Sequence, residues 1–377
     1  MRHARPRRSV LCLVPMPPPI TGAALASERA VQFFKAECEA LVIPYQRGTL
    51  ASGSFSFNQA LNIFCKGLSL FRTRLRRRES ITAVYAVISS TYLGNLRDLF
   101  LIALLGRKLR SKLVIHFHGA TFSDFLAGAP KLIQFLNRKL LGSARAAIVL
   151  SPRLRTSFEP AIPADRVYAV PNFADDEMFI STALLSSKYR GTGRVKFLFL
   201  SNLIRQKGYG LLLDAFLSLP YDVRKHAELH FAGLFGDDED QNAFGRRVRS
   251  NDNVAYHGLV TGSSKVALFA QSHVFCLPTS YEAQPISILE AYASGCAVIA
   301  SDYGVLADVF QEGVHGYRVN LEGHPEVNDK LLRRAIAACV ENPAAIAQFG
   351  AHNRQDAESR YRVQRYGVEI RNIVLGE

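Results

Sequence analysis

The sequence predicts an α/β protein with two domains, each built around a parallel sheet. Short apolar runs of strand length alternate with longer amphipathic segments of helix length, and turns rich in Gly, Pro, Ser and Asn separate them. Strands that alternate with helices in this way form parallel sheets with helices on both faces. The chain has 377 residues, of which 48% are hydrophobic, and this is enough for two separate cores.

The first predicted domain opens with a buried strand at residues 9–14, a turn that begins at Thr21, and a helix. A strand followed by a turn of small residues and a helix can seat a phosphate at the helix N-terminus. Gly22 and Ala23 are the small residues of this turn. The other elements of this domain are expected as strands at residues 83–89, 112–116 and 146–150, a helix at 96–105 and a second helix that starts at 151.

Two histidines mark the end of the strand at residues 112–116. His118, followed by Gly119, comes at the carboxyl end of the strand, where open α/β sheets bind their ligands. His116 is predicted to point to the other face of the sheet and to be buried support. A single histidine is as often structural as functional, so the residues alone leave both interpretations of His118 open.

Residues 48–80 are the least typical part of the chain, because they combine large apolar and basic side chains. The apolar ones are Phe55, Phe57, Leu61, Phe64, Leu68 and Phe71, and the basic ones are Lys66, Arg72, Arg74, Arg76, Arg77 and Arg78. A basic amphipathic helix can lie on an anionic lipid surface. The alternative is a helix that packs on the core and leaves its basic end in solvent.

The second predicted domain follows an acidic and polar linker at residues 175–192. Its first strand leads into a loop that carries Asn202, Arg205, Lys207 and Gly208, and then into an amphipathic helix. A lysine in front of a helix can bind a phosphate, or it can simply be solvated. Further elements are expected as strands at residues 228–233, 254–258, 274–277 and 297–300, and helices at 331–339 and 360–374.

The stretch 275–320 organises this second half. Pro285 fits the first turn of a helix that Gly295 ends, and two carboxylates with seven residues between them, Glu282 and Glu290, flank the helix start. At about 1.5 Å of rise per residue they lie roughly 12 Å apart, farther than the about 5 to 9.5 Å of carboxylates that act as a pair in glycoside hydrolysis. We expect them to contact different parts of one long ligand, with a phosphate at the helix start between them. The alternative is a carboxylate that stabilises the helix dipole and a second that is solvated.

The pattern Glu-x7-Glu within PTSYEAQPISILEAYASGCAVIASDYG, followed by GVHGYRV, resembles the donor site of family 4 retaining glycosyltransferases of GT-B architecture. The resemblance covers about 45 residues with the order of elements preserved. It implies two Rossmann-like domains whose parallel sheets face each other across a cleft. Residues 1–176 would form the acceptor-side domain and residues 177–359 the donor-binding domain, and the helix at 360–377 would pack back on the first domain.

The resemblance also assigns roles to residues. Glu282 would bind sugar hydroxyls and Glu290 the ribose, while Pro285 and Ile286 would bring the helix start to the diphosphate. Lys207 would bind the diphosphate, His118 would border the donor sugar, and Gly22 would face the cleft. Two departures stand out. Asn202 occupies the position of the arginine that usually accompanies the lysine, so that Arg205 becomes the candidate for a second cation. Gly304 is followed by residues 305–308, Val-Leu-Ala-Asp, where the family usually has a second glycine and Pro-Glu.

The charge of the chain is uneven. Residues 1–180 hold 25 Lys and Arg against 11 Asp and Glu, whereas residues 181–377 hold 21 of each, so the first half carries the whole net charge of +14. No nucleic-acid-binding motif is present, which favours an anionic membrane surface as the partner. The six cysteines are scattered, which is typical of a reducing cytoplasm, and the apolar run at residues 10–19 is too short and proline-rich to span a bilayer.

We therefore expect a cytoplasmic enzyme at the inner face of the membrane. It would move a sugar from a nucleotide diphosphate sugar to a saccharide or lipid-linked saccharide, with retention, in the synthesis of cell-surface polysaccharide or lipopolysaccharide. The stretch 275–320 contains no Asp-x-Asp motif, and no metal or other cofactor is expected. Two alternatives remain: a nucleotide-sugar epimerase or hydrolase on the same fold, and a non-catalytic membrane-associated scaffold.

Overall fold

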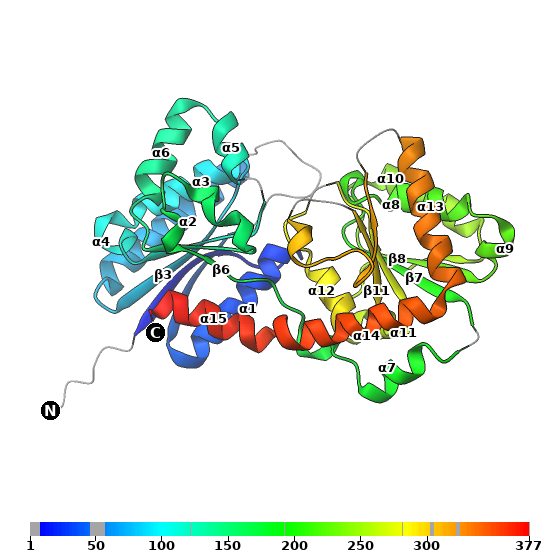
Figure 1. Cartoon of the computed structure of the whole chain (residues 1–377). Helices are drawn as coiled ribbons and strands as arrows, with labels where there is room; N and C mark the ends of the chain where they lie inside the picture. Colours follow the sequence, from blue (N-terminus) through cyan, green and yellow to red (C-terminus); the bar gives the residue numbers. More distant parts are fainter. Residues whose placement is uncertain are drawn as a thin grey trace. The chain divides into compact units, whose positions relative to one another are not determined.

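The computed structural model describes residues 8–45, 57–120, 122–191, 193–280, 282–301, 305–321 and 325–376. The chain divides into two compact units, Met1–Asn172 with Gln364–Glu377, and Phe173–Val363. Each unit contains one six-stranded parallel sheet with helices against it (Figure 1). The predicted α/β class with two parallel sheets is confirmed. Within the described residues, no helix combines the length and the apolar character that crossing a membrane requires.

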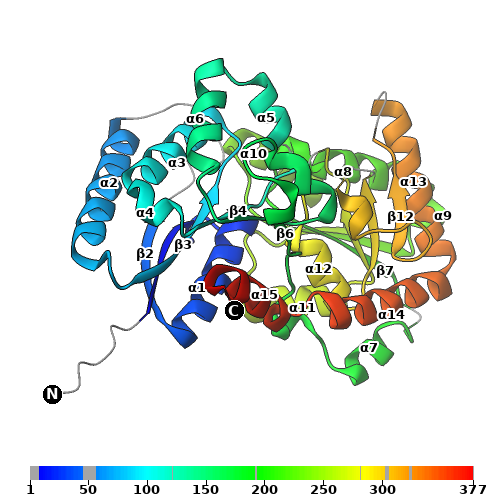
Figure 2. The ribbon, with the colours of Figure 1, turned by 60° about the vertical axis from the view of Figure 1, so that its left-hand side comes forward.

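The first unit has the strand order β2-β1-β3-β4-β5-β6. Its strands are β1 Ser9–Pro15, β2 Glu39–Tyr45, β3 Ile81–Ile88, β4 Leu113–Phe117, β5 Ala146–Val149 and β6 Val167–Ala169. Its helices are α1 Gly22–Glu37, α2 Phe57–Arg77, α3 Tyr92–Leu104, α4 Gly106–Arg110, α5 Phe122–Gly128, α6 Lys131–Leu141 and α15 Val363–Leu375, with the 3₁₀ turns η1 Pro152–Phe158 and η2 Ala164–Arg166. Helices α1 and α15 cover one face of the sheet, and α2, α3, α4 and α6 cover the other (Figure 2).

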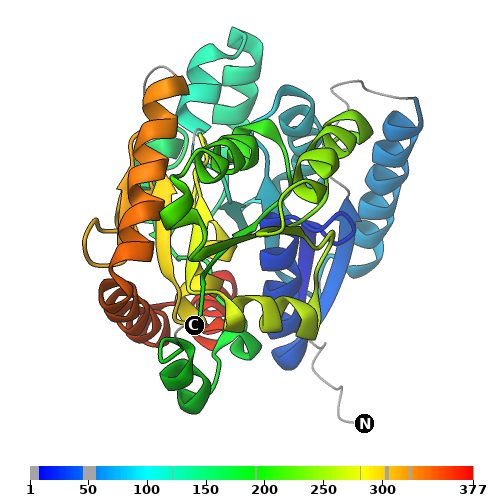
Figure 3. The same ribbon diagram turned by 90° about the vertical axis from the view of Figure 1, so that its right-hand side faces the viewer.

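The second unit has the order β12-β11-β10-β7-β8-β9. Its strands are β7 Val195–Leu200, β8 Ala227–Ala232, β9 Val254–Tyr256, β10 Val274–Leu277, β11 Ala297–Ser301 and β12 Gly316–Val319. Its helices are α7 Thr182–Lys188, α8 Tyr209–Leu217, α9 Tyr221–Arg224, α10 Asp238–Arg249, α11 Gly262–Gln271, α12 Ile286–Ala293, α13 Pro325–Glu341 and α14 Pro343–Arg360, with the 3₁₀ turns η3 Asp176–Met178, η4 Arg205–Lys207 and η5 Leu306–Asp308. Helix α13, in orange, runs alongside the sheet (Figure 3).

The strands are apolar because they are covered on both faces. Every residue of β1, β4, β5, β10 and β11 is buried, as expected for parallel strands between two helix layers. In the second unit the core gathers aromatic side chains from adjacent strands, among them Phe197, Phe231 and Phe275, all fully buried. These cores fix the loops at the carboxyl ends of the strands, where ligands bind in such folds.

The helix predicted to start at Ser151 is present as the 3₁₀ helix η1, with Ser151 as its N-cap. Pro160 follows it after one further residue, which prevents continuation. The prediction of a linker at residues 175–192 is wrong, because this segment contains η3 and α7 and belongs to the second unit. There the Lys188 ammonium donates to the carbonyls of Phe269 at 3.1 Å and Ser294 at 2.8 Å.

Candidate functional site

The candidate site lies in the second unit, at the carboxyl ends of β7 and β10. These two strands are neighbours in the middle of the sheet. From β7 the chain moves outward to β8 on one side, and from β10 it moves outward to β11 on the other. Such a change of direction leaves a crevice between two diverging loops, which is where doubly wound sheets bind their ligands.

The loops after β7 and β10 are joined by hydrogen bonds. The Gln206 carbonyl accepts from the Ser280 N–H at 2.9 Å, from the Thr279 hydroxyl at 3.1 Å and from the Ser280 hydroxyl at 3.2 Å. Gly208 follows with φ of +77°, and a Cβ at this position would lie 2.0 Å from the Pro278 carbonyl oxygen. Only glycine allows both this conformation and this close approach. The two loops are therefore held in a fixed register.

This register brings Lys207 and Glu282 together as an ion pair. Both side chains are about four-fifths buried, with 18% and 21% of their surfaces exposed. The two residues lie 75 positions apart in the sequence, and only the contact between the loops makes them neighbours. The pair places a cation where the chain leads into α12.

Helix α12 starts at the same place. Pro285 is its N-cap residue, with φ of −66° and ψ of 123°, so it lies just outside the helix and not in its first turn as expected. The N–H groups of the first turn, beginning at Ile286, have no acceptor four residues earlier within the helix and carry a partial positive charge. Together with Lys207 they form a surface suited to an anion.

Glu290 lies inside α12 and is 4% exposed. Its Oε1 accepts from the Lys265 ammonium of α11 at 2.6 Å. Burial raises the pKa of Glu290, Lys265 offsets part of this rise, and the nearby Asp175 and Glu177 add to it. Lys265 is therefore the group that favours the ionised carboxylate in this enclosed position.

The two carboxylates of the Glu-x7-Glu pattern thus have different partners. Glu282 pairs with Lys207 at the entrance of α12, and Glu290 pairs with Lys265 within the fold. Neither carboxylate is the solvated residue of the alternative interpretation. The arrangement suits two separate contacts along one extended ligand.

Arg205 and Asn202 do not extend this cluster. Arg205 is 83% exposed and pairs with Asp240 of α10, with its Nη2 3.1 Å from Oδ1. Asn202 is half-buried in the loop after β7, and its carbonyl accepts from the Ile204 N–H at 2.9 Å. Among the described side chains, Lys207 is the cation that pairs with Glu282, and Arg205 is directed to another helix.

The remaining predicted site residues lie in the first unit. Gly22 is the first residue of α1, whose N-cap Thr21 accepts from the Ala24 N–H at 3.2 Å, and Ala23 is buried. His118 follows β4, and its ring centroid lies 3.9 Å from that of His116. The prediction that these histidines point to opposite faces is wrong, because residues two apart in an extended chain share a face.

His116 is buried support, as predicted. It is fully buried, and its Nδ1 is 2.7 Å from the Tyr85 hydroxyl. Burial lowers its pKa to about 3, so the ring is neutral at physiological pH. His118 is half-buried and rests on this neutral ring.

Sequence reasoning missed Lys265, Gln206 and Asp240. Lys265 lies on another helix, 25 residues before Glu290, and no local spacing connects the two. Gln206 acts through its backbone carbonyl, which the side chain does not reveal. Within the described ranges, no group of three or more His, Cys, Asp or Glu side chains is arranged to hold a metal ion.

The residues of this site lie in a segment that is similar to known proteins. Residues 186–356 match the family described as glycosyl transferases group 1. Over 232 residues the chain is 28% identical to the phosphatidyl-myo-inositol mannosyltransferase of Mycobacterium tuberculosis, a match that covers 61% of this chain. The chain spans 58% of the length of that relative.

Two solved structures share the fold over almost the whole chain. The Anabaena protein Alr3699/HepE, in complex with UDP and glucose, has a TM-score of 0.72 at 15% identity, covering 98% of this chain and 100% of that one. WaaG, a glycosyltransferase involved in lipopolysaccharide biosynthesis, has a TM-score of 0.70 at 13% identity with the same coverage. Both have the GT-B fold, and so does this chain.

Proposed function

We propose that this chain, which belongs through residues 186–356 to the glycosyl transferases group 1 family, moves a sugar from a nucleotide diphosphate sugar to a hydroxyl group of a saccharide or lipid-linked acceptor. One observation carries the proposal. Lys207, Glu282 and the start of α12 meet at the switch point of the sheet, within the segment that matches the family. They form a cationic seat with a carboxylate beside it.

The proposed chemistry follows from the charge that develops on the departing diphosphate. Lys207 and the N–H groups at the start of α12 stabilise that charge electrostatically, because they are held in place before the reaction begins. Glu282 accepts hydrogen bonds from hydroxyl groups of the sugar. Glu290 accepts from the ribose, and Lys265 favours the ionised form of its carboxyl group for this role.

We further propose retention of the anomeric configuration and a reaction that needs no divalent metal ion. The resemblance of the Glu-x7-Glu segment to retaining enzymes supports the first point. Lys207 and the partial positive charge at the start of α12 support the second, since they supply positive charge that a metal would otherwise provide. By the same resemblance, we propose that His118 borders the donor sugar and that Gly22 belongs to the donor-binding residues.

The acceptor is proposed from the relatives. One related protein is a mannosyltransferase that acts on phosphatidyl-myo-inositol, and one with the same fold takes part in lipopolysaccharide biosynthesis. A lipid-linked acceptor used in the assembly of cell-surface glycans fits both. The donor would then be in the cytoplasm, and the enzyme would work at the inner face of the membrane.

Helix α2 supports a site at the membrane. Its exposed apolar row, with side chains 40% to 66% exposed, is made of Leu61, Phe64, Leu68, Phe71 and Leu75. Spacings of three and four residues place this row on one side of the helix. The helix carries five basic residues and no acidic one. An apolar row on a basic helix is attracted by an anionic lipid surface.

A nucleotide-sugar panel tests the proposal. UDP-, GDP- and other nucleotide sugars are scored by the rise in melting temperature of the purified protein, and each sugar that binds is offered with lipid-linked acceptors. We expect one nucleotide to stabilise the protein and its sugar to be transferred. Donor consumption without an acceptor would indicate a hydrolase or an epimerase. Nucleotide binding without turnover on any acceptor would indicate a non-catalytic protein, an alternative for which the missing arginine at Asn202 is the best support.

A further inference from the structure

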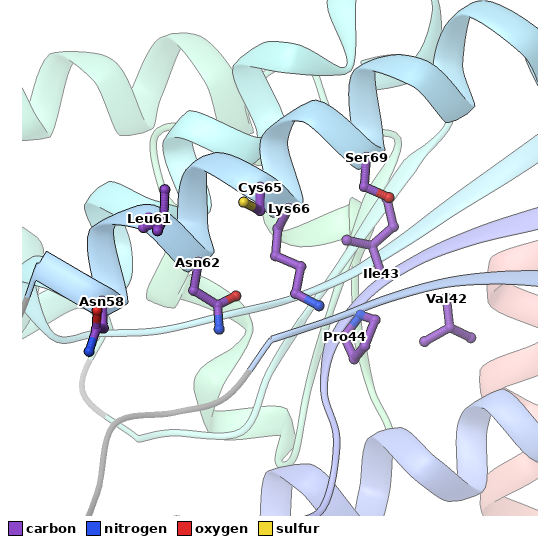
Figure 4. A pocket seen from close by; sticks show the side chains of 9 residues that line it. All are labelled: Val42, Ile43, Pro44, Asn58, Leu61, Asn62, Cys65, Lys66 and Ser69. Atoms are coloured by element: carbon purple, nitrogen blue, oxygen red, sulfur yellow. The ribbon is translucent and has the colours of Figure 1, made fainter.

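A groove of about 420 Å³ lies in the first unit between α2 and the edge strand β2. Asn58, Asn62, Lys66 and Ser69 line it from the helix, and Ile43 and Pro44 line it from the strand. Figure 4 shows Asn62 and Lys66 extending from α2 toward β2, while Leu61 points away from the strand. None of these residues belongs to the donor site in the second unit.

The polar side chains of the groove form one stripe of the helix. Positions 58, 62, 66 and 69 recur at four and three residues, so they share a face. The stripe offers an ammonium group, two carboxamides and a hydroxyl, and none of the described lining side chains is acidic. A lysine supplies up to three donors and each carboxamide two donors and an acceptor. Such a set fits a ligand with hydroxyl groups and a negative charge.

The groove is continuous with the exposed apolar row of α2. Leu61 belongs to the lining of the groove and is also the first member of that row. A ligand whose polar part occupies the groove therefore has its apolar part beside Leu61 and Phe64. One helix thus presents a polar stripe and an apolar row to the two halves of an amphiphile.

We propose that this groove binds the phosphorylated polyol headgroup of a lipid acceptor, with the lipid chains along the apolar row. This inference rests on the proposed function, because it assigns the acceptor class for the same reaction. Lys66 holds the phosphate, and Asn58, Asn62 and Ser69 bind the hydroxyl groups. The groove adds selectivity for the headgroup to the general attraction of a basic helix for anionic lipid.

Cys65 provides a direct readout of the groove. It lines the groove and is an exposed free thiol, whereas the other described cysteines are buried. Alkylation of Cys65 by iodoacetamide is followed by mass spectrometry with soluble glycerophosphoinositol, inositol or inorganic phosphate present. We expect glycerophosphoinositol to slow the alkylation at concentrations at which inositol and phosphate do not. Equal protection by phosphate alone, or no protection by glycerophosphoinositol, would overturn the assignment.

Variants of α2 distinguish specific binding in the groove from the general electrostatic attraction of a basic helix. Lys66→Met should weaken protection by glycerophosphoinositol about ten-fold, the value of one lost charge-assisted hydrogen bond, and Asn62→Leu should act in the same direction. Arg72→Met is the matched control, because it removes the same charge from α2 at an exposed position that does not line the groove. If Arg72→Met had an equal effect, the groove would not bind the headgroup specifically, and Lys66 would act only as part of a basic surface.

Binding to vesicles tests whether the headgroup that the groove recognises belongs to a membrane lipid. At matched charge, wild-type protein should bind phosphatidylcholine vesicles with phosphatidylinositol more tightly than vesicles with phosphatidylserine, and Lys66→Met should remove that preference. Equal binding of both vesicles by the wild type would refute the headgroup assignment. Thermal shifts with nucleotide sugars are measured on the same samples. If nucleotide sugars still bind but neither protection of Cys65 nor the vesicle preference is seen, only this inference is contradicted. If nucleotide sugars do not bind, the proposed function is contradicted.

Discussion

Replacing Lys265 by methionine removes the ammonium that pairs with the buried Glu290 but keeps an unbranched side chain to fill the space. The Nζ–Oε1 distance is 2.6 Å, and the side chains are 15% and 5% exposed. Breaking a buried ion pair from one side costs about 3 to 5 kcal/mol, because the remaining charge is left without a partner. Lys265 keeps some contact with water, so we expect the lower end, about 3 kcal/mol of unfolding free energy at pH 8.

The loss of unfolding free energy in Lys265→Met should be larger at high pH than at low pH. Burial raises the pKa of Glu290 in the folded protein even with Lys265 present. A raised acid pKa means that the folded state binds more protons, so stability falls as the pH rises from the unfolded value of about 4.3 through the folded pKa. Without Lys265 that pKa rises further. Urea denaturation should therefore show a larger penalty for Lys265→Met at pH 8 than at pH 5.

A double-mutant cycle gives the control. Glu290→Gln removes the charge that Lys265 compensates, so the double variant Lys265→Met/Glu290→Gln should recover most of the lost stability. We expect a coupling energy of about 2 kcal/mol, within the range for residues in contact. Donor binding supplies a second readout, since Lys265→Met should weaken it more at pH 6 than at pH 8, where more of Glu290 is ionised. Penalties that do not change with pH, or a coupling near zero, would refute the role assigned to Lys265.

The other expectations are simpler to test. Lys207→Ala should abolish sugar transfer while the circular dichroism spectrum stays native, and full activity would remove Lys207 from the site. Gly208→Ala should lower the melting temperature and weaken nucleotide binding, because its Cβ would lie 2.0 Å from the Pro278 carbonyl oxygen at a φ of +77°; a stable variant with wild-type affinity contradicts this. The triple substitution Arg76→Ser, Arg77→Ser and Arg78→Ser should reduce sedimentation with anionic vesicles at low salt, and unchanged binding excludes these arginines as the contact. Treatment with EDTA should leave transfer unaffected, and restoration of a lost activity by Mg²⁺ would show that a metal takes part.

The sequence predicted the strands that are buried on both faces, because such burial leaves a clear apolar run, whereas β2, β6 and β12 were not predicted. The expected strand at residues 274–277 coincides with β10, Val274–Leu277. Helices α5 and α6 were missed, and α6 shows why. Leu132 and Phe135 are exposed, while Asn137 is fully buried and shares hydrogen bonds with Asn95 of α3. Its apolar spacing therefore does not mark its buried face, and the residues alone cannot reveal it.

The site was predictable where its chemistry is local and not where it depends on which loops meet. Glu282 and Glu290 stand out by their spacing around a helix start. The partner of each lies far away in the sequence, 75 residues before Glu282 for Lys207 and 25 residues before Glu290 for Lys265. Arg205 was assigned to the diphosphate because it is near Lys207 in sequence, but it pairs with Asp240, 35 residues further on.

The two ion pairs differ in a way that matters for a reaction cycle. Lys207 and Glu282 keep about a fifth of their surface in solvent. In the proposed reaction, an arriving diphosphate would compete for the ammonium and leave the carboxylate free for sugar hydroxyls. Glu290 is enclosed, and Lys265 contacts its Oε1. A carboxylate has about four acceptor positions, so in the proposed reaction Glu290 would accept from ribose hydroxyls without losing its contact with Lys265. The outer pair is therefore suited to exchange its partner on binding, and the inner pair is suited to keep its geometry throughout.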